Sequence, residues 1–498
     1  MAGDYPILGG GDVNLYSLFV ERAQALVRPD GVVALPTPSG IAADKGAAPF
    51  FRSIATSQRL GALFDFENRK FFFADVHASF KFCTLVFGGL ARKFKETRCA
   101  FFLHHLDEMD DTDRVLALSA ADFGLMNPNT GAAPIFRSTR DLAITRTIYE
   151  RQKVLVHKGR SSISLGQLPD EVTWPVSYST AFHMTNDSAK FLGVGQLRAR
   201  GFQPSAWGWW ADGHAIARPL LVGRMIHQFD HRHASVTVVE GNIRNAAVGA
   251  VLSDARKAGP DVFANPQYWV LEDDMAPGDE VWCVGFRDIA RSTDVRTMIA
   301  AVLPHGAAGN TLPLLRHKAA TMSHGLMCCF LAMLNSIVFD FVTRQKAQST
   351  HLNWYILEQL PVIPPARFDD PLPAAFATHV RAAGLMNGHH AEPTIADFVV
   401  PQVLALSYTA HDLAPFARDL GYVDDQGQVL PPIVWNDEDR RRRLAALDAL
   451  FFYLYGLGLD DAAYVMDTFP IVRQQDIADF GRFRTWDDVL ALLPFFKG

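Results

Sequence analysis

The sequence predicts an α/β fold at its start, a mixed α and β region in its middle and a helical region at its end. Helix-like and strand-like patterns alternate over the first 90 residues, as in a sheet whose strands are joined by helices. From about residue 370, polar and apolar residues recur at helical spacing. The length of 498 residues allows about two to four domains.

The first predicted helix covers residues 14–28, and its apolar residues recur at helical spacing: Leu15, Leu18, Phe19, Ala25 and Leu26. Asn14 suits the N-cap position because its side chain can accept hydrogen bonds from the first free amides. The continuous apolar run Val32 to Leu35 predicts a strand that is covered on both faces. The same patterns predict a helix over 47–57 and strands over 60–66 and 81–87.

Composition bounds the class of protein. A hydrophobic fraction of 49% with 20% charged residues suits a well-cored globular protein, and a net charge of -6 excludes a basic nucleic-acid coat. Five cysteines without a CxxC pair favour a reduced, cytoplasmic compartment, and the N-terminus has no signal-peptide pattern. Polar residues interrupt the apolar run 326–342, which therefore predicts a buried helix and no membrane span.

Three groups of basic residues are candidates for contact with phosphate or bases. The segment 137–160 holds seven Lys and Arg, which suits either phosphate binding or a solvated helix face, and both interpretations stay open. Arginine can also read guanine with two hydrogen bonds. Arg287, Arg291 and Arg296 are candidates, for which pairing with Asp288 and Asp294 is the alternative, and Arg316 and Lys318 belong to a further basic cluster.

His231-Arg232-His233 has two metal-ligand side chains but no third and fourth ligand at a suitable spacing, so we expect no metal site there.

Several segments together resemble one enzyme family. Asn14-Leu15-Tyr16 with Phe19, followed by the helix and by a strand ending at Pro36, resembles the part that follows the catalytic motif in gamma-class adenine-N6 DNA methyltransferases. Segments 220–232 and 286–304 resemble the target recognition domain of large, type IIG-like restriction-modification enzymes and related phage-defence methylases. The segments 352–362, 444–457, 467–470 and 481–485 also resemble that family.

The resemblance implies a partial class I methyltransferase domain with a Rossmann-like sheet over 1–90, and a connecting region over 91–215. An α+β target recognition domain over 216–365 and a C-terminal helical module over 366–498 would follow. It implies double-stranded DNA as partner and S-adenosylmethionine as cofactor of the complete enzyme. A separate N-terminal methyltransferase half or other defence-system subunits are further expected partners.

The resemblance also implies roles for individual residues. Asn14, Tyr16 and Pro36 would form the wall beside the catalytic loop. Phe73 would stack on the extruded target adenine, with Phe72 and Phe80 as alternatives, because chemistry on a paired base needs the base outside the stack. A plain core role for these phenylalanines is the alternative.

The family's catalytic motifs are missing from the sequence. Residues 1 to 13 contain no Asn-Pro-Pro-Tyr or Asn-Pro-Pro-Phe, and no strand precedes Gly9-Gly10-Gly11. Asn265-Pro266-Gln267-Tyr268 has the wrong third residue and position, so we interpret it as a turn. We therefore expect a split or truncated gene, no catalytic residue, no tight cofactor binding and no methyl transfer by this chain alone. A non-catalytic DNA-binding specificity subunit, or a decayed fragment, is the alternative.

Overall fold

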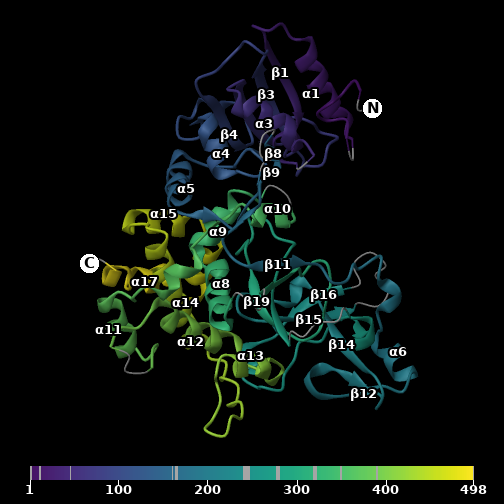
Figure 1. The fold of residues 1–498 in the computed structure, drawn as a ribbon, viewed down its shortest axis with the longest axis vertical. Coiled ribbons are helices and arrows are strands. Elements are labelled where there is room, and N and C mark those ends of the chain that lie inside the picture. The colour runs from purple at the N-terminus through teal and green to yellow at the C-terminus, as the bar shows by residue number, and fades with distance from the viewer. Residues whose placement is uncertain are drawn as a thin grey trace. The chain divides into compact units, whose positions relative to one another are not determined.

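The computed structural model describes residues 3–10, 13–44, 46–159, 161–162, 166–238, 247–275, 281–317, 322–347, 350–387 and 391–496. The chain forms two compact units. The first comprises Met1–Val172 and Glu358–Pro361, and the second comprises Thr173–Leu357 and Val362–Gly498. The fold is mixed α and β with several small sheets and a C-terminal helical region (Figure 1). The expected division into four domains remains a prediction.

The first unit is built on a five-stranded sheet of order β1-β3-β2-β4-β5. Its strands are β1 (Val32–Pro38), β2 (Leu60–Glu67), β3 (Lys81–Gly88), β4 (Thr97–Leu103) and β5 (Leu116–Leu118). β3 runs antiparallel to both β1 and β2, and β2 runs parallel to β4. The carboxyl ends of β1, β2 and β4 therefore meet at one edge of the sheet. The predicted strands 60–66 and 81–87 are confirmed as β2 and β3.

The helices of the first unit are α1 (Leu15–Leu26), α2 (Gly40–Ala43), α3 (Ala48–Thr56), α4 (Ala120–Met126) and α5 (Thr139–Arg151). The predicted helices 14–28 and 47–57 correspond to α1 and α3. Phe50 and Phe51 of α3 are fully buried and meet Phe87 of β3 and Phe123 of α4 edge to face. Short strands complete the unit: β6 (Lys153–Val154), β7 (Val156–His157), β8 (Ser161–Ser162), β9 (Gly166–Gln167) and β10 (Glu171–Val172).

Two expectations about the start of the chain are corrected. Asn14 occupies the N-cap of α1, but its side chain makes no capping bond. Leu15, Phe19 and Leu26 lie on the solvent side of α1, 70 to 75% exposed, whereas Leu18 and Val20 are buried. Of the large apolar residues in the predicted set, only Leu18 is buried, and the buried side of α1 also includes Ser17 and Glu21.

The strand β1 was expected to be covered on both faces, and this is wrong. Alternate residues of β1, from Val32 to Pro38, are exposed. Among the described residues, β1 pairs only with β3, so its other edge is open. Pro36 and Pro38 suit such a position, because proline has no N–H to donate to a second neighbour.

The second unit contains a four-stranded sheet, a five-stranded sheet and a hairpin. The four-stranded sheet has the order β11 (Val176–Ser179), β21 (Leu314–His317), β18 (Trp282–Phe286), β19 (Ala300–Pro304). The five-stranded sheet contains β12 (Gln203–Pro204), β13 (Trp210–Ala211), β14 (Ile216–Leu221), β17 (Trp269–Leu271) and β20 (Ala307–Ala308). The hairpin is β15 (Ala234–Val238) with β16 (Ala247–Val251), and β22 covers Pro361–Val362.

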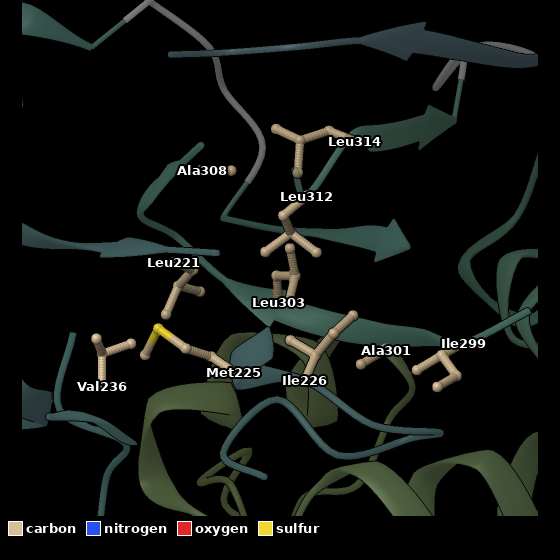
Figure 2. Packing of buried hydrophobic residues seen from close by; sticks show 10 residues of the cluster. All are labelled: Leu221, Met225, Ile226, Val236, Ile299, Ala301, Leu303, Ala308, Leu312 and Leu314. Carbon is tan, nitrogen blue, oxygen red and sulfur yellow. The ribbon is translucent and has the colours of Figure 1, made fainter. Parts of the chain in front are cut away.

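Buried apolar side chains join these sheets. In Figure 2, side chains from β14, β15 and β19 to β21 and from the turn at Met225 and Ile226 lie near one another. They are Leu221, Met225, Ile226, Val236, Ile299, Ala301, Leu303, Ala308, Leu312 and Leu314. Their burial makes the β region of the second unit one packed body.

Helices form the rest of the second unit. The α-helices are α6 (Val194–Ala199), α7 (Asp254–Lys257), α8 (His324–Asn335), α9 (Ile337–Arg344), α10 (Trp354–Leu357), α11 (Ala374–Ala382), α12 (Ile395–Ser407), α13 (Ala414–Asp419), α14 (Asp437–Leu454), α15 (Leu459–Asp467), α16 (Pro470–Phe480) and α17 (Arg484–Leu490). From α11 onward, every helix or strand assigned in the described chain is a helix, which confirms the predicted helical region.

The apolar run 326–342 is buried as predicted, but it forms two helices. Ser336 ends α8, and its hydroxyl accepts a hydrogen bond from Phe339 N–H at 3.2 Å, which caps α9. The two helices are bent by 56°. Among the described residues, no single helix has both the length and the apolar character to cross a membrane, and only this bent pair meets that test jointly.

A buried carboxylate ties α9 to the loop before β19. Asp340 is inaccessible to solvent and accepts hydrogen bonds from Arg296 Nε at 2.5 Å and from Thr297 N–H at 3.0 Å. Arg296 also donates to the carbonyl of Asn335 at 2.6 Å. The loop is therefore held by a charge pair that excludes water.

We expect Asp340→Ala to lower the free energy of unfolding by about 3–5 kcal/mol, because the variant leaves Arg296 buried without its acid. Urea-induced unfolding of the full chain measures this loss. The matched control is Asp467→Ala, which removes an exposed ion pair with Arg473 and should cost less than about 1 kcal/mol. Equal losses in the two variants would contradict the structural importance of Asp340.

Candidate functional site

Three loops meet at the carboxyl edge of the first unit's sheet, where β1, β2 and β4 end. The hydroxyl of Ser39, just after β1, donates to the carboxylate of Asp65 in β2. Glu67 at the end of β2 binds Arg69 Nε at 2.8 Å and His104 Nε2 at 3.0 Å, and His104 directly follows β4. The carboxyl ends of parallel strands are where ligands usually bind in α/β sheets, so this edge is the candidate site.

Residues 68–80, which connect β2 to β3, form a loop with exposed phenylalanines, here named the aromatic loop. Phe71, Phe73 and Phe80 are 61%, 48% and 64% exposed. Phe72 instead turns inward, with its ring 5.3 Å from that of Phe66 and 5.1 Å from that of Phe82. Large apolar groups gathered on an exposed loop mark a binding surface more often than a packing role.

The fully buried side chain of Asn68 holds the aromatic loop in place. Its Nδ2 donates to the carbonyls of Phe73 at 2.8 Å and Val76 at 3.0 Å, and its Oδ1 accepts from Phe73 N–H at 2.8 Å. The backbone N–H of Asn68 also donates to the carbonyl of Phe80. One amide therefore satisfies three backbone groups and fixes the course of the loop.

The loop begins with two residues in the left-handed region of backbone conformation. Arg69 has a φ of 44° and Lys70 has a φ of 61°. For residues with a Cβ, such a conformation costs about 1 kcal/mol or more and persists only where the surroundings determine it. Backbone strain of this kind gathers at binding and catalytic sites.

Burial shifts the titration of two groups near this edge. Asp65 lies in the sheet, and desolvation raises its pKa to about 6, although the Ser39 hydroxyl and the N–H of Phe102 stabilise the ionised form. Desolvation and the neighbouring charge of Asp44 raise the pKa of Tyr16 to about 12. Tyr16 is half-buried and bonds Asp44, whereas the other two expected wall residues, Asn14 and Pro36, are exposed.

In the second unit, the arginine candidates differ in burial and in hydrogen-bond partners. Arg296 is buried on Asp340, and Arg287 donates to the carbonyls of Gly223 at 3.1 Å and of Ile226. Neither pairs through its side chain with Asp288 or Asp294 as the alternative proposed, and Asp288 binds His351 at 2.6 Å. The guanidinium groups of Arg287 and Arg296 are therefore occupied within the protein.

Arg291 is exposed, and Arg316 is half-buried on β21. Lys318 lies outside the described residues. Of Arg287, Arg291 and Arg296, Arg291 alone is exposed to solvent.

The segment 231–233 is bonded to parts of the second unit that lie far from it in the sequence. His231 Nε2 lies 3.0 Å from the carboxylate of Asp412, and Arg232 donates to the carbonyls of Gly259 and Thr409. Among the described residues, no group of three or more His, Cys, Asp or Glu side chains is arranged to hold a metal ion.

A cavity of about 350 Å³ lies in the second unit, lined by residues that include Tyr268, Arg287 and Thr311. Gln267 and Tyr268 also line this cavity, and the backbone of residues 265–268 is neither helix nor strand. The side-chain amide of Gln267 donates a hydrogen bond to the Tyr268 hydroxyl at 3.0 Å.

Sequence reasoning missed Asn68, Asp65 and Phe102. An asparagine directly after a strand and before three phenylalanines was the available signal for Asn68.

Comparison with known proteins gives distant likenesses only. No family model matches the chain, and no curated protein matches it. The type IIL restriction-modification enzyme MmeI in complex with DNA is 9% identical with a TM-score of 0.39, and the match covers 94% of this chain and 54% of that enzyme.

Two further solved structures are similar at the same distance. The type IIG restriction endonuclease BpuSI is 11% identical with a TM-score of 0.27, covering 90% of this chain and 50% of that enzyme. The DrdV-DNA complex is 10% identical with a TM-score of 0.29, covering 92% and 41%. The chain therefore spans about half the length of the enzymes it matches, at similarities that do not assign a fold or an activity.

We expect Asn68→Ala to loosen the aromatic loop, because the N–H of Phe73 and two carbonyls lose their partner. Hydrogen exchange measured by mass spectrometry should show faster exchange of the amides in residues 69–80. Phe73→Ala is the matched control, since Asn68 binds only the backbone of Phe73. Faster exchange in both variants to the same degree would mean that the ring, and not the amide, holds the loop.

Proposed function

We propose that this chain is the DNA-recognising part of an S-adenosylmethionine-dependent adenine-N6 DNA methyltransferase of restriction-modification or phage-defence type. A separate part supplies the cofactor loop and the catalytic tetrapeptide. The observation that carries the proposal is the aromatic loop, which presents Phe71, Phe73 and Phe80 to solvent on a loop fixed by Asn68. A base that undergoes chemistry leaves the DNA stack, and an aromatic face holds it there.

The packing and exposure of the rings favour one phenylalanine as the stacking residue. Phe72 packs against Phe66 and Phe82, so its ring is unsuited to a base. Phe73 remains the first choice, because its ring rests edge to face on Phe82 at 5.2 Å and about half of the residue stays exposed. Phe80 and Phe71 are the alternatives.

The open flank of the sheet supports the need for a second part. Among the described residues, one edge of β1 has no neighbouring strand, and Leu15, Phe19 and Leu26 of α1 are exposed. An unpaired strand edge next to apolar side chains favours pairing with another strand-bearing polypeptide. In the proposed enzyme, that polypeptide carries the catalytic loop beside the wall residues Asn14, Tyr16 and Pro36.

A non-catalytic DNA-binding specificity subunit is the second candidate. The observation that favours it is the sequence, which contains no Asn-Pro-Pro-Tyr or Asn-Pro-Pro-Phe. In that function the aromatic loop and Arg291 would contact DNA, and another subunit would act on it.

We expect Phe73→Ala to weaken binding of a duplex whose target adenine is mismatched by about 5- to 150-fold, because stacking of one base on an aromatic ring contributes about 1–3 kcal/mol. Fluorescence anisotropy with labelled DNA measures the affinity. Leu90→Ala, which removes another exposed apolar side chain of the first unit, is the control. Unchanged affinity after alanine replacement of Phe71, Phe73 and Phe80 together would exclude base stacking by this loop.

We expect no methyl transfer by the chain alone. Purified protein incubated with radiolabelled S-adenosylmethionine and mixed-sequence duplex DNA should incorporate no label into adenine. Clear incorporation would contradict the assignment of catalysis to a separate part.

A further inference from the structure

We propose that Lys81, Phe102 and Arg137 form a binding site for a backbone phosphate of nucleic acid, at the same sheet edge as the aromatic loop. This inference rests on the proposed function, in which the chain binds DNA. It adds that these three residues bind a phosphate of that DNA. The base would stack on the loop, and the phosphate would bind the two cations.

Two cations converge on one aromatic ring at this edge. The Nζ atom of Lys81 lies 4.5 Å from the centroid of the Phe102 ring, and the guanidinium carbon of Arg137 lies 5.2 Å from it. Lys81 is the first residue of β3 and directly follows Phe80 of the aromatic loop, whereas Arg137 precedes the N-cap of α5. Because both positive charges lie close to one ring, an anion bound at this edge would be attracted by both.

The backbone that carries this ring is held on both sides. Phe102 lies in β4 with a φ of 55°, in the left-handed region. Its N–H bonds the buried carboxylate of Asp65, and its carbonyl accepts from Arg114 at 3.1 Å. The backbone of Phe102 is therefore fixed on both sides in a conformation that costs about 1–2 kcal/mol for a residue with a Cβ.

Several other cations of the first unit form ion pairs with acids. Arg146 pairs with Asp122, Lys153 with Glu171 and Lys158 with Glu358. Within the described parts of the chain, Lys81 and Arg137 form no ion pair with an acid, although Lys81 and Asp65 interact electrostatically at longer range. The basic segment 137–160 thus contains cations that pair with acids, and it contains Arg137, which lies over the Phe102 ring.

Phosphate suits this combination of groups. Arginine offers a planar fork of donors that can hold two phosphate oxygens, and lysine adds a compact charge. An exposed aromatic loop beside a pair of cations is the arrangement by which proteins bind an unpaired nucleotide.

The test is DNA binding by the full chain carrying Lys81→Gln and Arg137→Gln, measured by fluorescence anisotropy over a series of salt concentrations. We expect affinity to fall at low salt, and the slope of log K against log salt to decrease by about 1, because one phosphate contact is lost. The matched control is Arg92→Gln with Lys95→Gln. It removes the same charge from the loop at the opposite edge of the sheet, where Arg92 lies over the Phe94 ring.

The outcomes separate this inference from the proposed function. If the unaltered chain binds DNA and the Lys81/Arg137 variant binds with the same affinity and slope, the phosphate site is refuted while base stacking stands. If the control variant loses as much as the test variant, the effect is net charge and the site is also refuted. If the unaltered chain binds no DNA even at low ionic strength, the proposed function and this inference both fail.

A conservative variant guards against misfolding. Arg137→Lys keeps the charge at an exposed position and should retain most of the affinity. Arg137→Gln alone should lose affinity with an unchanged thermal unfolding midpoint. A loss of similar size in Arg137→Lys, with a lowered thermal unfolding midpoint in both variants, would show that the side chain stabilises the fold and does not bind the DNA.

Discussion

The amide of Asn68 is the constraint on which the candidate site depends. Without it, a loop with three exposed phenylalanines would collapse onto the nearest apolar surface, because exposed aromatic area is unfavourable in water. By bonding three backbone groups of the loop, the amide keeps the rings of Phe71, Phe73 and Phe80 apart from the core. The fold thereby keeps apolar surface available for a ligand.

Charged groups in the two units act in different ways. In the second unit, Arg296 and Arg232 are buried and bonded to Asp340 and to backbone carbonyls, so their charges stabilise loops. In the first unit, Lys81 and Arg137 lie over a ring without a close acid among the described residues. A DNA-binding role therefore cannot be assigned to an arginine from sequence alone, since the same residue type stabilises a buried loop in one place and is exposed to solvent in another.

The sequence predicted where the regular elements lie better than which way they face. The patterns located α1, α3, β2 and β3, but of the large apolar residues predicted to form one face of α1, Leu18 is buried while Leu15 and Phe19 are exposed. The break at Ser336 was also not predicted, because a polar residue inside an apolar run indicates either burial or a cap. The candidate site was predicted only as a group of phenylalanines. Its remaining parts depend on a left-handed φ at Phe102 and on contacts between segments distant in sequence, which no local pattern encodes.

The open edge of β1 and the exposed side of α1 have a consequence for the amount of this protein that can accumulate in a cell. Unpaired backbone groups beside large apolar side chains promote association with whatever strand is nearest, including that of another copy. Pro36 and Pro38 restrict the part of the strand that can pair with a second strand to its first half. If the proposed second part covers this flank, copies of the chain made in excess of that part would be removed by chaperones and proteases, which act on exposed apolar surface. The cellular amount of the chain would then follow the amount of the proposed second part.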